Sequence, residues 1–349
     1  MVNIKLLKET ISEIGELDQE VMEKAKARLD NLTKPPGSLG YLEDLAIQLA
    51  GIAGDIFPDV SKKEHIIMVG DHGVVKEGVS AFPQSITQAM VKNFLNGGAA
   101  VNVLARQHEI NISIVDIGMV DRIEDEKVVQ ANVKRGTNNL LTGPAMSREQ
   151  AVKSIEVGIE ITNELIAQGA ELIGTGEMGI GNTTPSSAII KAATDLSLDQ
   201  VVGFGTGLDE EGLANKKKVV KKALDVNQPD SQDGLDILSK VGGLEIGGMA
   251  GIMLAGARAR RPVLIDGLIS AAAALIAYLI EPKVVNFLIP SHKSVEPGHA
   301  SLYNFLDMEP MFDLSMRLGE GTGAVLGMSI VESSNRIIKE MATFDTLDI

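Results

Sequence analysis

Short apolar runs alternate with segments of helical length along most of this 349-residue chain. Six of the runs are predicted to be strands, over residues 65–69, 112–117, 172–173, 201–204, 263–265 and 285–289. Six of the intervening segments are predicted to be helices, over residues 85–106, 148–168, 186–194, 210–223, 234–258 and 268–279. This alternation predicts an α/β fold in which helices cover both faces of a doubly wound parallel sheet of about six strands.

The two ends of the chain lack this alternation. They contain helical segments, such as residues 18–32 and 323–341, with no strand between them. We expect a small helical domain built from residues 1–30 plus 295–349, beside a large α/β domain formed by residues 31–294. The sequence KPPGS after the first of these helices is expected to end it, because paired prolines stop a helix and glycine turns the chain.

Polar or glycine-rich turns follow nearly every predicted strand. They occupy residues 70–73, 118, 174–184, 205–207, 266–267 and 291–294. The carboxyl ends of parallel strands lie at one edge of the sheet, where open α/β folds bind their ligands. These segments, far apart in the chain, are therefore expected to form one cleft.

Composition and charge limit the partners of that cleft. A net charge of −15 argues against nucleic acids and anionic membranes, and 3% aromatic residues argue against base stacking. A phosphate ligand is therefore expected to be small and to need a locally positive pocket. With no cysteine, the chain has neither disulfides nor thiolate ligands. No signal-peptide core is evident, and the longest apolar run, residues 268–280, is too short for a bilayer, so we expect a cytoplasmic protein with no membrane partner.

The sequence GTGEMGIGNTT places Glu177 in the middle of a predicted glycine-rich turn between a strand and a helix. Thr184 is the predicted N-cap of that helix and Pro185 its first residue. Asn182, Thr183 and the first-turn N–H groups are expected to face a phosphate, and Glu177 a sugar hydroxyl or a developing positive charge. An ordinary turn with a solvated Glu177 explains the segment equally well.

The same glycines permit a different function. Gly174-x-Gly176-x-x-Gly179, with Asp195 following, satisfies the dinucleotide fingerprint and keeps open an NAD-binding Rossmann oxidoreductase. Glu177 argues against it, because the carboxylate would face the pyrophosphate. A nucleotide-binding sensor without catalytic activity is a further alternative.

A second carboxylate between glycines is Glu320, in the sequence RLGEGTG. Its apolar neighbours Met316 and Leu318 are expected to raise its pKa toward the range of a general base. The alternative is a loop glutamate that caps a helix beginning near Thr322.

Other ionisable residues favour structural roles. The five histidines show no metal-ligand spacing, and hydrogen bonds at turns are expected for His72, His292 and His299. No metal site is therefore predicted. Lysines 216–218 are typical of a solvated helix face. The alternative is that one of the three points inward and neutralises a phosphate.

Eight ordered segments resemble the nicotinate-nucleotide:dimethylbenzimidazole phosphoribosyltransferase family. They are LTKPPGSLG (32–40), GDHGV (70–74), GPAMSR (143–148), GEMGIGNTTP (176–185), SKVGG (239–243), LIDG (264–267), IPSH (289–292) and MRLGEGTGA (316–324). They extend over nearly the whole chain, and several long motifs in order are far more specific than one glycine loop.

The resemblance implies a Rossmann-like parallel sheet, a small helical domain from both chain ends, and a homodimer. It implies transfer of ribose 5-phosphate from nicotinate mononucleotide to 5,6-dimethylbenzimidazole, giving α-ribazole 5′-phosphate and nicotinate with inversion at the anomeric carbon. It also implies that no metal or other cofactor is required, because the donor already carries a cationic pyridinium leaving group.

The resemblance also assigns residues to roles. Glu320 matches the family's general base, which takes the N–H proton of the benzimidazole, and Glu177 matches its second glutamate. Phosphate binding is expected from Gly179, Gly181, Asn182, Thr183, Gly205, Lys216 and Ser294. The pocket for the base maps to Phe82, Met90, Met178 and Leu318. Some relatives carry smaller or more polar residues at the first two of these positions, and an apolar, methionine-lined pocket suits a methylated base.

Overall fold

The computed structural model describes residues 4–205 and 207–347, and within them six strands form one entirely parallel sheet. The strands are β1 (Lys63–Gly70), β2 (Asn111–Gly118), β3 (Val128–Gln130), β4 (Leu172–Met178), β5 (Val263–Ile265) and β6 (Leu288–Pro290). Their order across the sheet is β3-β2-β1-β4-β5-β6. Winding therefore reverses between β1 and β4, which places a ligand-binding crevice at their carboxyl ends. The predicted doubly wound fold is confirmed.

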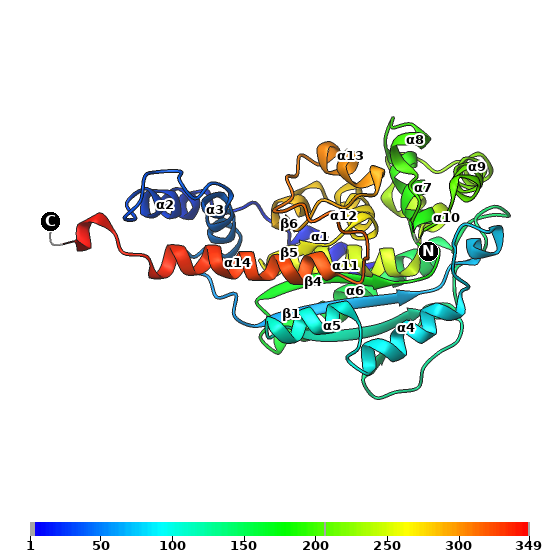
Figure 1. Cartoon of the computed structure of the whole chain (residues 1–349), viewed down its shortest axis with the longest axis horizontal. Coiled ribbons are helices and arrows are strands. Elements are labelled where there is room, and N and C mark those ends of the chain that lie inside the picture. The colour runs from blue at the N-terminus through cyan, green and yellow to red at the C-terminus, as the bar shows by residue number, and fades with distance from the viewer. Residues whose placement is uncertain (1–3, 206, 348–349) are drawn as a thin grey trace.

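Helices cover both faces of this sheet (Figure 1). They are α1 (Lys5–Ser12), α2 (Gln19–Asp30), α3 (Tyr41–Ala53), α4 (Ser85–Leu95), α5 (Ala100–Gln107), α6 (Arg148–Ala167), α7 (Thr183–Ala193), α8 (Leu198–Val201), α9 (Glu210–Asn227), α10 (Gly234–Val241), α11 (Leu244–Arg258), α12 (Leu268–Ile280), α13 (Pro297–Phe305) and α14 (Thr322–Glu340). Short 3₁₀ segments are η1 (Gly73–Glu77), η2 (Pro282–Phe287) and η3 (Phe344–Thr346). None of the helices in the described ranges combines the length and the apolar character needed to cross a membrane.

The core consists of two apolar layers, one on each face of the sheet. Along β1, Ile66 and Met68 join the cluster built with α6, α11 and α12, whereas Ile67 and Val69 join the cluster built with α5 and α14. This is the period-2 alternation of a strand, but both faces are dry. The strand therefore appears in the sequence as a continuous apolar run.

The two chain ends meet beside the sheet. Helices α2 and α3 pack on each other and on α14, and a separate apolar cluster there includes Ala25, Leu29, Ala50 and Ile338. The other part of α14 lies against β4 and β5, so that this helix runs from the sheet to α2 and α3 (Figure 1). The division into residues 31–294 and residues 1–30 plus 295–349 stays a prediction.

The structure differs from the predicted strands at three places. Residues 201–204 are not a strand: Val201 ends the short helix α8, which begins with a capping box between Ser197 and Gln200, and residues 202–204 have no regular structure. Strand β3 was not predicted, since it has three residues at the sheet edge and two of them are exposed. Of the predicted strand 285–289, the first three residues belong instead to η2.

Two predicted helices are each divided in two. The segment 85–106 is broken at Asn96, Gly97 and Gly98 into α4 and α5, and Gly97 adopts a φ of 69°. The segment 234–258 is broken at Gly242 and Gly243 into α10 and α11. In both cases glycine removes the local preference for continuing the helix.

Candidate active site

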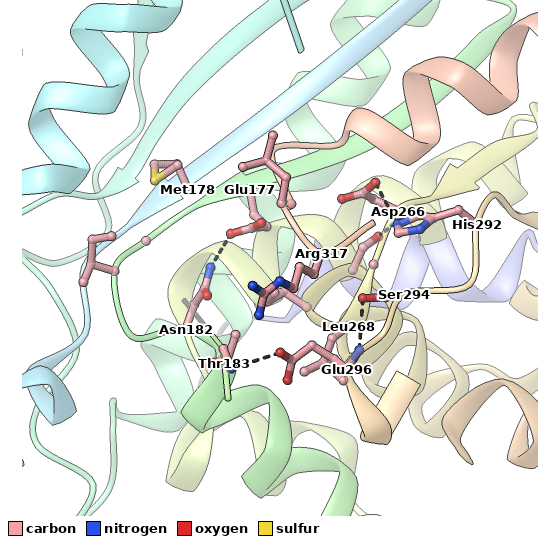
Figure 2. Close-up of a pocket in the computed structure, with 18 residues that line it drawn as sticks. Glu177, Met178, Asn182, Thr183, Asp266, Leu268, His292, Ser294, Glu296 and Arg317 are labelled. Carbon is pink, nitrogen blue, oxygen red and sulfur yellow. Dashed lines mark hydrogen bonds and ion pairs between the residues drawn. The ribbon is translucent and has the colours of Figure 1, made fainter. Parts of the chain in front are cut away.

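A cleft opens at the carboxyl edge of the sheet, beyond β4, β5 and β6 (Figure 2). The space between its lining atoms is about 680 Å³ including the open mouth. The cleft is lined by Glu177, Met178, Gly179, Ile180, Asn182, Thr183, Gly205, Asp266, Gly267, Leu268, Ile269, Ser270, His292, Ser294, Glu296, Arg317, Leu318 and Gly319. The first turns of α7 and α12 both reach it, so two helix N-termini present their positive ends to a ligand. The expected convergence of loops on one cleft is thus found.

Glu177 lies in a strand and not in a turn. Strand β4 extends to Met178, which corrects the prediction that it ends at residue 173. The Glu177 side chain points into the cleft, where the amide of Asn182 donates a hydrogen bond to Oε2 (Figure 2). The Glu320 backbone N–H also donates to Glu177 Oε1, at 3.3 Å. Burial, followed by the negative charges of Asp266 and Glu245, raises the pKa of Glu177 to about 8.

The turn after β4 leads directly into α7. Gly181 has a φ of 91°, Asn182 is the N-cap, and the helix begins at Thr183. The prediction that Thr184 is the N-cap is therefore wrong, because this residue already lies inside the helix. Asn182 directs its amide to Glu177 instead of capping α7, which couples the helix start to the strand carboxylate.

A buried lysine lies beneath the opposite end of the cleft. Lys216 on α9 is fully buried and donates to Thr183 Oγ1 at 2.7 Å and to the Gly203 carbonyl at 3.2 Å. Burial lowers its pKa to about 8, although the nearby Glu296 carboxylate opposes this effect. Its neighbour Lys217 pairs with Asp199 at 2.7 Å. Of the three consecutive lysines, Lys216 is therefore the one that turns inward.

Glu296 is a cleft carboxylate that sequence reasoning missed. It is 8% exposed, and its Oε1 accepts the Gly205 N–H at 3.0 Å. The loop that carries it is fixed by Ser294, whose N–H donates to His299 Nδ1 at 3.0 Å. The Gly205 N–H, which the sequence assigned to phosphate, thus donates to the Glu296 carboxylate in this structure. The sequence EPGH (296–299) in this loop matches no functional motif, so Glu296 could not be recognised from the sequence.

Glu320 lies in a tight loop just before α14. It has a φ of 64°, between Gly319 at 84° and Gly321 at 85°, and its side chain is 4% exposed. Burial raises its pKa to about 7, an N–H of Val101 opposes the shift, and the Asp266 carboxylate adds to it. Oε2 has no hydrogen-bond partner among the described residues. A buried carboxyl group with this pKa and an oxygen that no described residue engages is suited to accept a proton.

The residues assigned to the base pocket do not all lie at the cleft. Met178 and Leu318 line the cleft, and Leu318 is 58% exposed. Met90 on α4 and Met178 pack against the same apolar cluster. Phe82, in the loop before α4, is 48% exposed. Among the assigned residues, Phe82, Met90, Gly181, Lys216 and Glu320 do not line the cleft itself.

The histidines near the site have side-chain or backbone partners. His72 Nε2 lies 2.7 Å from Glu245 Oε1, with both side chains fully buried, and His292 Nε2 lies 3.6 Å from Asp266 Oδ1. Over residues 4–205 and 207–347, no three histidine, aspartate or glutamate side chains gather as a metal site would require.

Comparisons with known proteins agree on one family. Residues 14–349 match the family model described as "Phosphoribosyltransferase". The nicotinate-nucleotide–dimethylbenzimidazole phosphoribosyltransferase of Desulforamulus reducens is 53% identical over 97% of this chain and 97% of its own. The protein of the same name from Halalkalibacterium halodurans is 50% identical over 97% of this chain and 95% of its own. The crystal structure of CobT from Thermus thermophilus superposes with a TM-score of 0.90 at 42% identity, covering 93% of this chain and 98% of that one.

Proposed function

Because the chain belongs to the nicotinate-nucleotide–dimethylbenzimidazole phosphoribosyltransferase family, we propose that it transfers ribose 5-phosphate from nicotinate mononucleotide to 5,6-dimethylbenzimidazole. The products are α-ribazole 5′-phosphate and nicotinate. The new bond joins the ribose C1′ to a ring nitrogen of the base, and the bond from C1′ to the pyridinium nitrogen breaks with its electron pair going to nicotinate.

The observation that carries this proposal is the pair of buried glutamates at the carboxyl edge of β4. The Glu320 N–H donates to Glu177 Oε1 at 3.3 Å, so the two residues are adjacent although they come from different segments. Their pKa values are raised to about 7 for Glu320 and about 8 for Glu177. Two carboxyl groups in different environments can serve separate tasks in such a reaction, one accepting the proton and the other stabilising the positive charge.

In this proposal Glu320 is the base. As C1′ bonds to one azole nitrogen, positive charge develops on the ring and its N–H proton becomes more acidic. Because its pKa is about 7, Glu320 is ionised in most molecules above neutral pH. It can then accept that proton.

Glu177 serves the ribose side. Before substrates bind, its high pKa keeps it largely protonated at neutral pH. Arrival of a cationic pyridinium and an oxocarbenium-like ribose favours its ionised form, so that the charge appears where the transition state needs it.

The phosphate would bind at the other end of the cleft. The first turn of α7 and the loop glycines supply N–H groups, and Lys216, held against Thr183, supplies a positive charge below them. The assigned groups are Gly179, Gly181, Asn182, Thr183, Gly205, Lys216 and Ser294. For the Gly205 N–H to reach phosphate, the Glu296 carboxylate must first leave it.

The geometry of β4 disfavours the NAD-dependent alternative. Gly174 and Gly176 lie inside the strand, and a Cβ on Gly176 would lie 2.5 Å from His65 Nε2. These glycines therefore make room for a buried side chain and do not form a turn around a pyrophosphate.

We further infer a homodimer, as the family resemblance implies. Leu314, in the segment before the Glu320 loop, is 61% exposed and does not line the cleft, and a second subunit would cover such a side chain. Light scattering is expected to give the mass of two chains; the mass of one chain would contradict the inference. The cytoplasmic location stays a prediction.

Incubation with nicotinate mononucleotide and 5,6-dimethylbenzimidazole tests the proposal. We expect equal amounts of nicotinate and of a nucleotide whose anomeric proton coupling identifies the α-linkage. Donor binding without product would favour the non-catalytic sensor. A reaction that depends on NAD would favour the oxidoreductase.

A further inference from the structure

The Glu320 loop is held in a conformation that its sequence alone does not favour. Three consecutive residues, Gly319, Glu320 and Gly321, have φ values of 84°, 64° and 85°. Glycine adopts such values readily, but a glutamate does so only where its surroundings fix it. The residues that fix it are therefore part of how the carboxyl group is placed.

His65 is one of these residues. It lies inside β1, is fully buried, and its Nε2 is 3.0 Å from the Glu320 carbonyl oxygen. Since a carbonyl oxygen only accepts, Nε2 carries the proton and donates it. Nδ1 has no hydrogen-bond partner in the described chain, and burial lowers the pKa of His65. The ring is therefore neutral, with one defined tautomer.

Three glycines provide the space for this imidazole. A Cβ on Gly174 would lie 2.8 Å from His65 Nδ1, one on Gly176 would lie 2.5 Å from Nε2, and one on Gly321 would lie 2.0 Å from Cε1. Such distances are far inside van der Waals contact. The glycines in β4 and the glycine after Glu320 thus share one function, which is to admit the ring between the strand and the loop.

Asp266 holds the other side of the loop. It follows β5, is 2% exposed, and its Oδ2 accepts the Gly321 N–H at 3.2 Å. Its Oδ1 accepts the N–H groups of Gly323 at 2.7 Å and Ala324 at 3.3 Å, in the first turn of α14. A carboxylate at a helix N-terminus is well placed electrostatically, so this contact also fixes the direction in which α14 begins.

We propose that His65 and Asp266 are positioning residues that hold residue 320 in its left-handed conformation and thereby aim the Glu320 carboxyl group. Neither side chain is required to touch substrate for this role. His65 fixes the carbonyl of residue 320 and Asp266 fixes the next N–H along the chain. The inference rests on the proposed role of Glu320 as the base.

Two variants of His65 separate the hydrogen bond from the packing. His65→Gln keeps an N–H donor near the position of Nε2, whereas His65→Leu fills similar space without a donor. We expect His65→Leu to lower kcat about 10- to 100-fold, the loss of one buried hydrogen bond, with the KM for nicotinate mononucleotide changed less than about threefold. His65→Gln should recover most of that loss. Equal losses in both variants, or an unchanged kcat in His65→Leu, would overturn the proposal.

Crystal structures of the same variants provide a readout that does not depend on activity. Residue 320 should keep its positive φ in His65→Gln and leave it in His65→Leu. A positive φ retained in His65→Leu would contradict the proposal, whatever the enzyme does.

If His65→Leu does not fold, Asp266→Ala replaces it, because it removes both carboxylate oxygens that accept the N–H groups of Gly321, Gly323 and Ala324. It should lower kcat with little change in the KM for the donor, and residue 320 should again leave positive φ. An unchanged kcat with an unchanged loop would sink the idea. Wild-type protein that makes no nucleotide would refute the proposed function, whereas the crystal structures would still decide this inference.

Discussion

The two segments that carry Glu177 and Glu320 have similar compositions and different backbones. In β4, Gly174 and Gly176 are extended, and they are small because His65 occupies the space beside them. Before α14, Gly319 and Gly321 have positive φ, and so does the glutamate between them. A carboxylate between glycines therefore has no single structural role. One is a rigid strand residue whose pKa is raised to about 8, and the other is a constrained loop residue whose pKa is raised to about 7.

Replacing each carboxylate separately should have the largest effect on activity. Glu320→Gln should lower kcat by about 10²–10⁴, the range for loss of a general base, while nicotinate mononucleotide still binds. Glu177→Gln should lower kcat less, because the base remains. Steady-state kinetics and donor titration measure both. Glu340→Gln, the same change at the exposed end of α14, serves as the control and should behave as wild type. Equal losses at positions 177 and 320 would remove the distinction between them.

At the phosphate end of the cleft, Lys216 is predicted to bind the donor. Lys216→Met should raise the KM for nicotinate mononucleotide about tenfold or more, because a buried positive charge beside Thr183 is lost. The KM for the base should change little. Lys218→Met, on the exposed side of α9, is the matched control. Similar KM values in the two variants would show that the inward lysine does not serve the phosphate.

The Tm of the ligand-free protein, measured as a function of pH, is expected to report the raised pKa values of Glu177 and Glu320. Each has a folded pKa above its usual 4.5, so between these values the folded state retains a proton that the unfolded state releases. Wild-type stability therefore falls, relative to the glutamine variant, as pH rises through this window. The Tm of Glu177→Gln minus the Tm of the wild type should rise by about 5–7 °C between pH 4.5 and pH 8, because a pKa shift of this size is worth about 5 kcal/mol. For Glu320→Gln the rise should be smaller and end near pH 7. A Tm difference independent of pH would contradict the raised pKa values.

The sequence predicts this fold well where a strand is buried on both faces. Strand β1 is a continuous apolar run because Ile66 and Ile67 face two different dry layers. Strand β3 has no such run, since it lies at the sheet edge with one buried residue. Residues 201–204 have the apolar composition of a strand, but Val201 ends α8, which begins with a capping box at Ser197, and residues 202–204 join no strand.

The site is predictable only in part for a similar reason. Ordered motifs identify Glu177 and Glu320, because each motif is local in the sequence. The contacts that hold them are not local: His65 and Glu320 are separated by 255 positions, and Asp266 and Gly323 by 57. Nothing in the neighbourhood of His65 distinguishes a loop-positioning imidazole from an ordinary buried one. Such residues become visible only once the strands are placed side by side.

The pH dependence of kcat, with both substrates saturating, tests whether Glu320 is the base, because bound donor already favours the ionised form of Glu177. If Glu320 is the base, wild-type activity should fall as the pH drops below about 7, because the carboxylate takes up the proton that it must accept from the azole. The residual activity of Glu320→Gln should lack this acid limb. An acid limb with the same midpoint in both proteins would contradict the account, because the titrating group would then lie elsewhere.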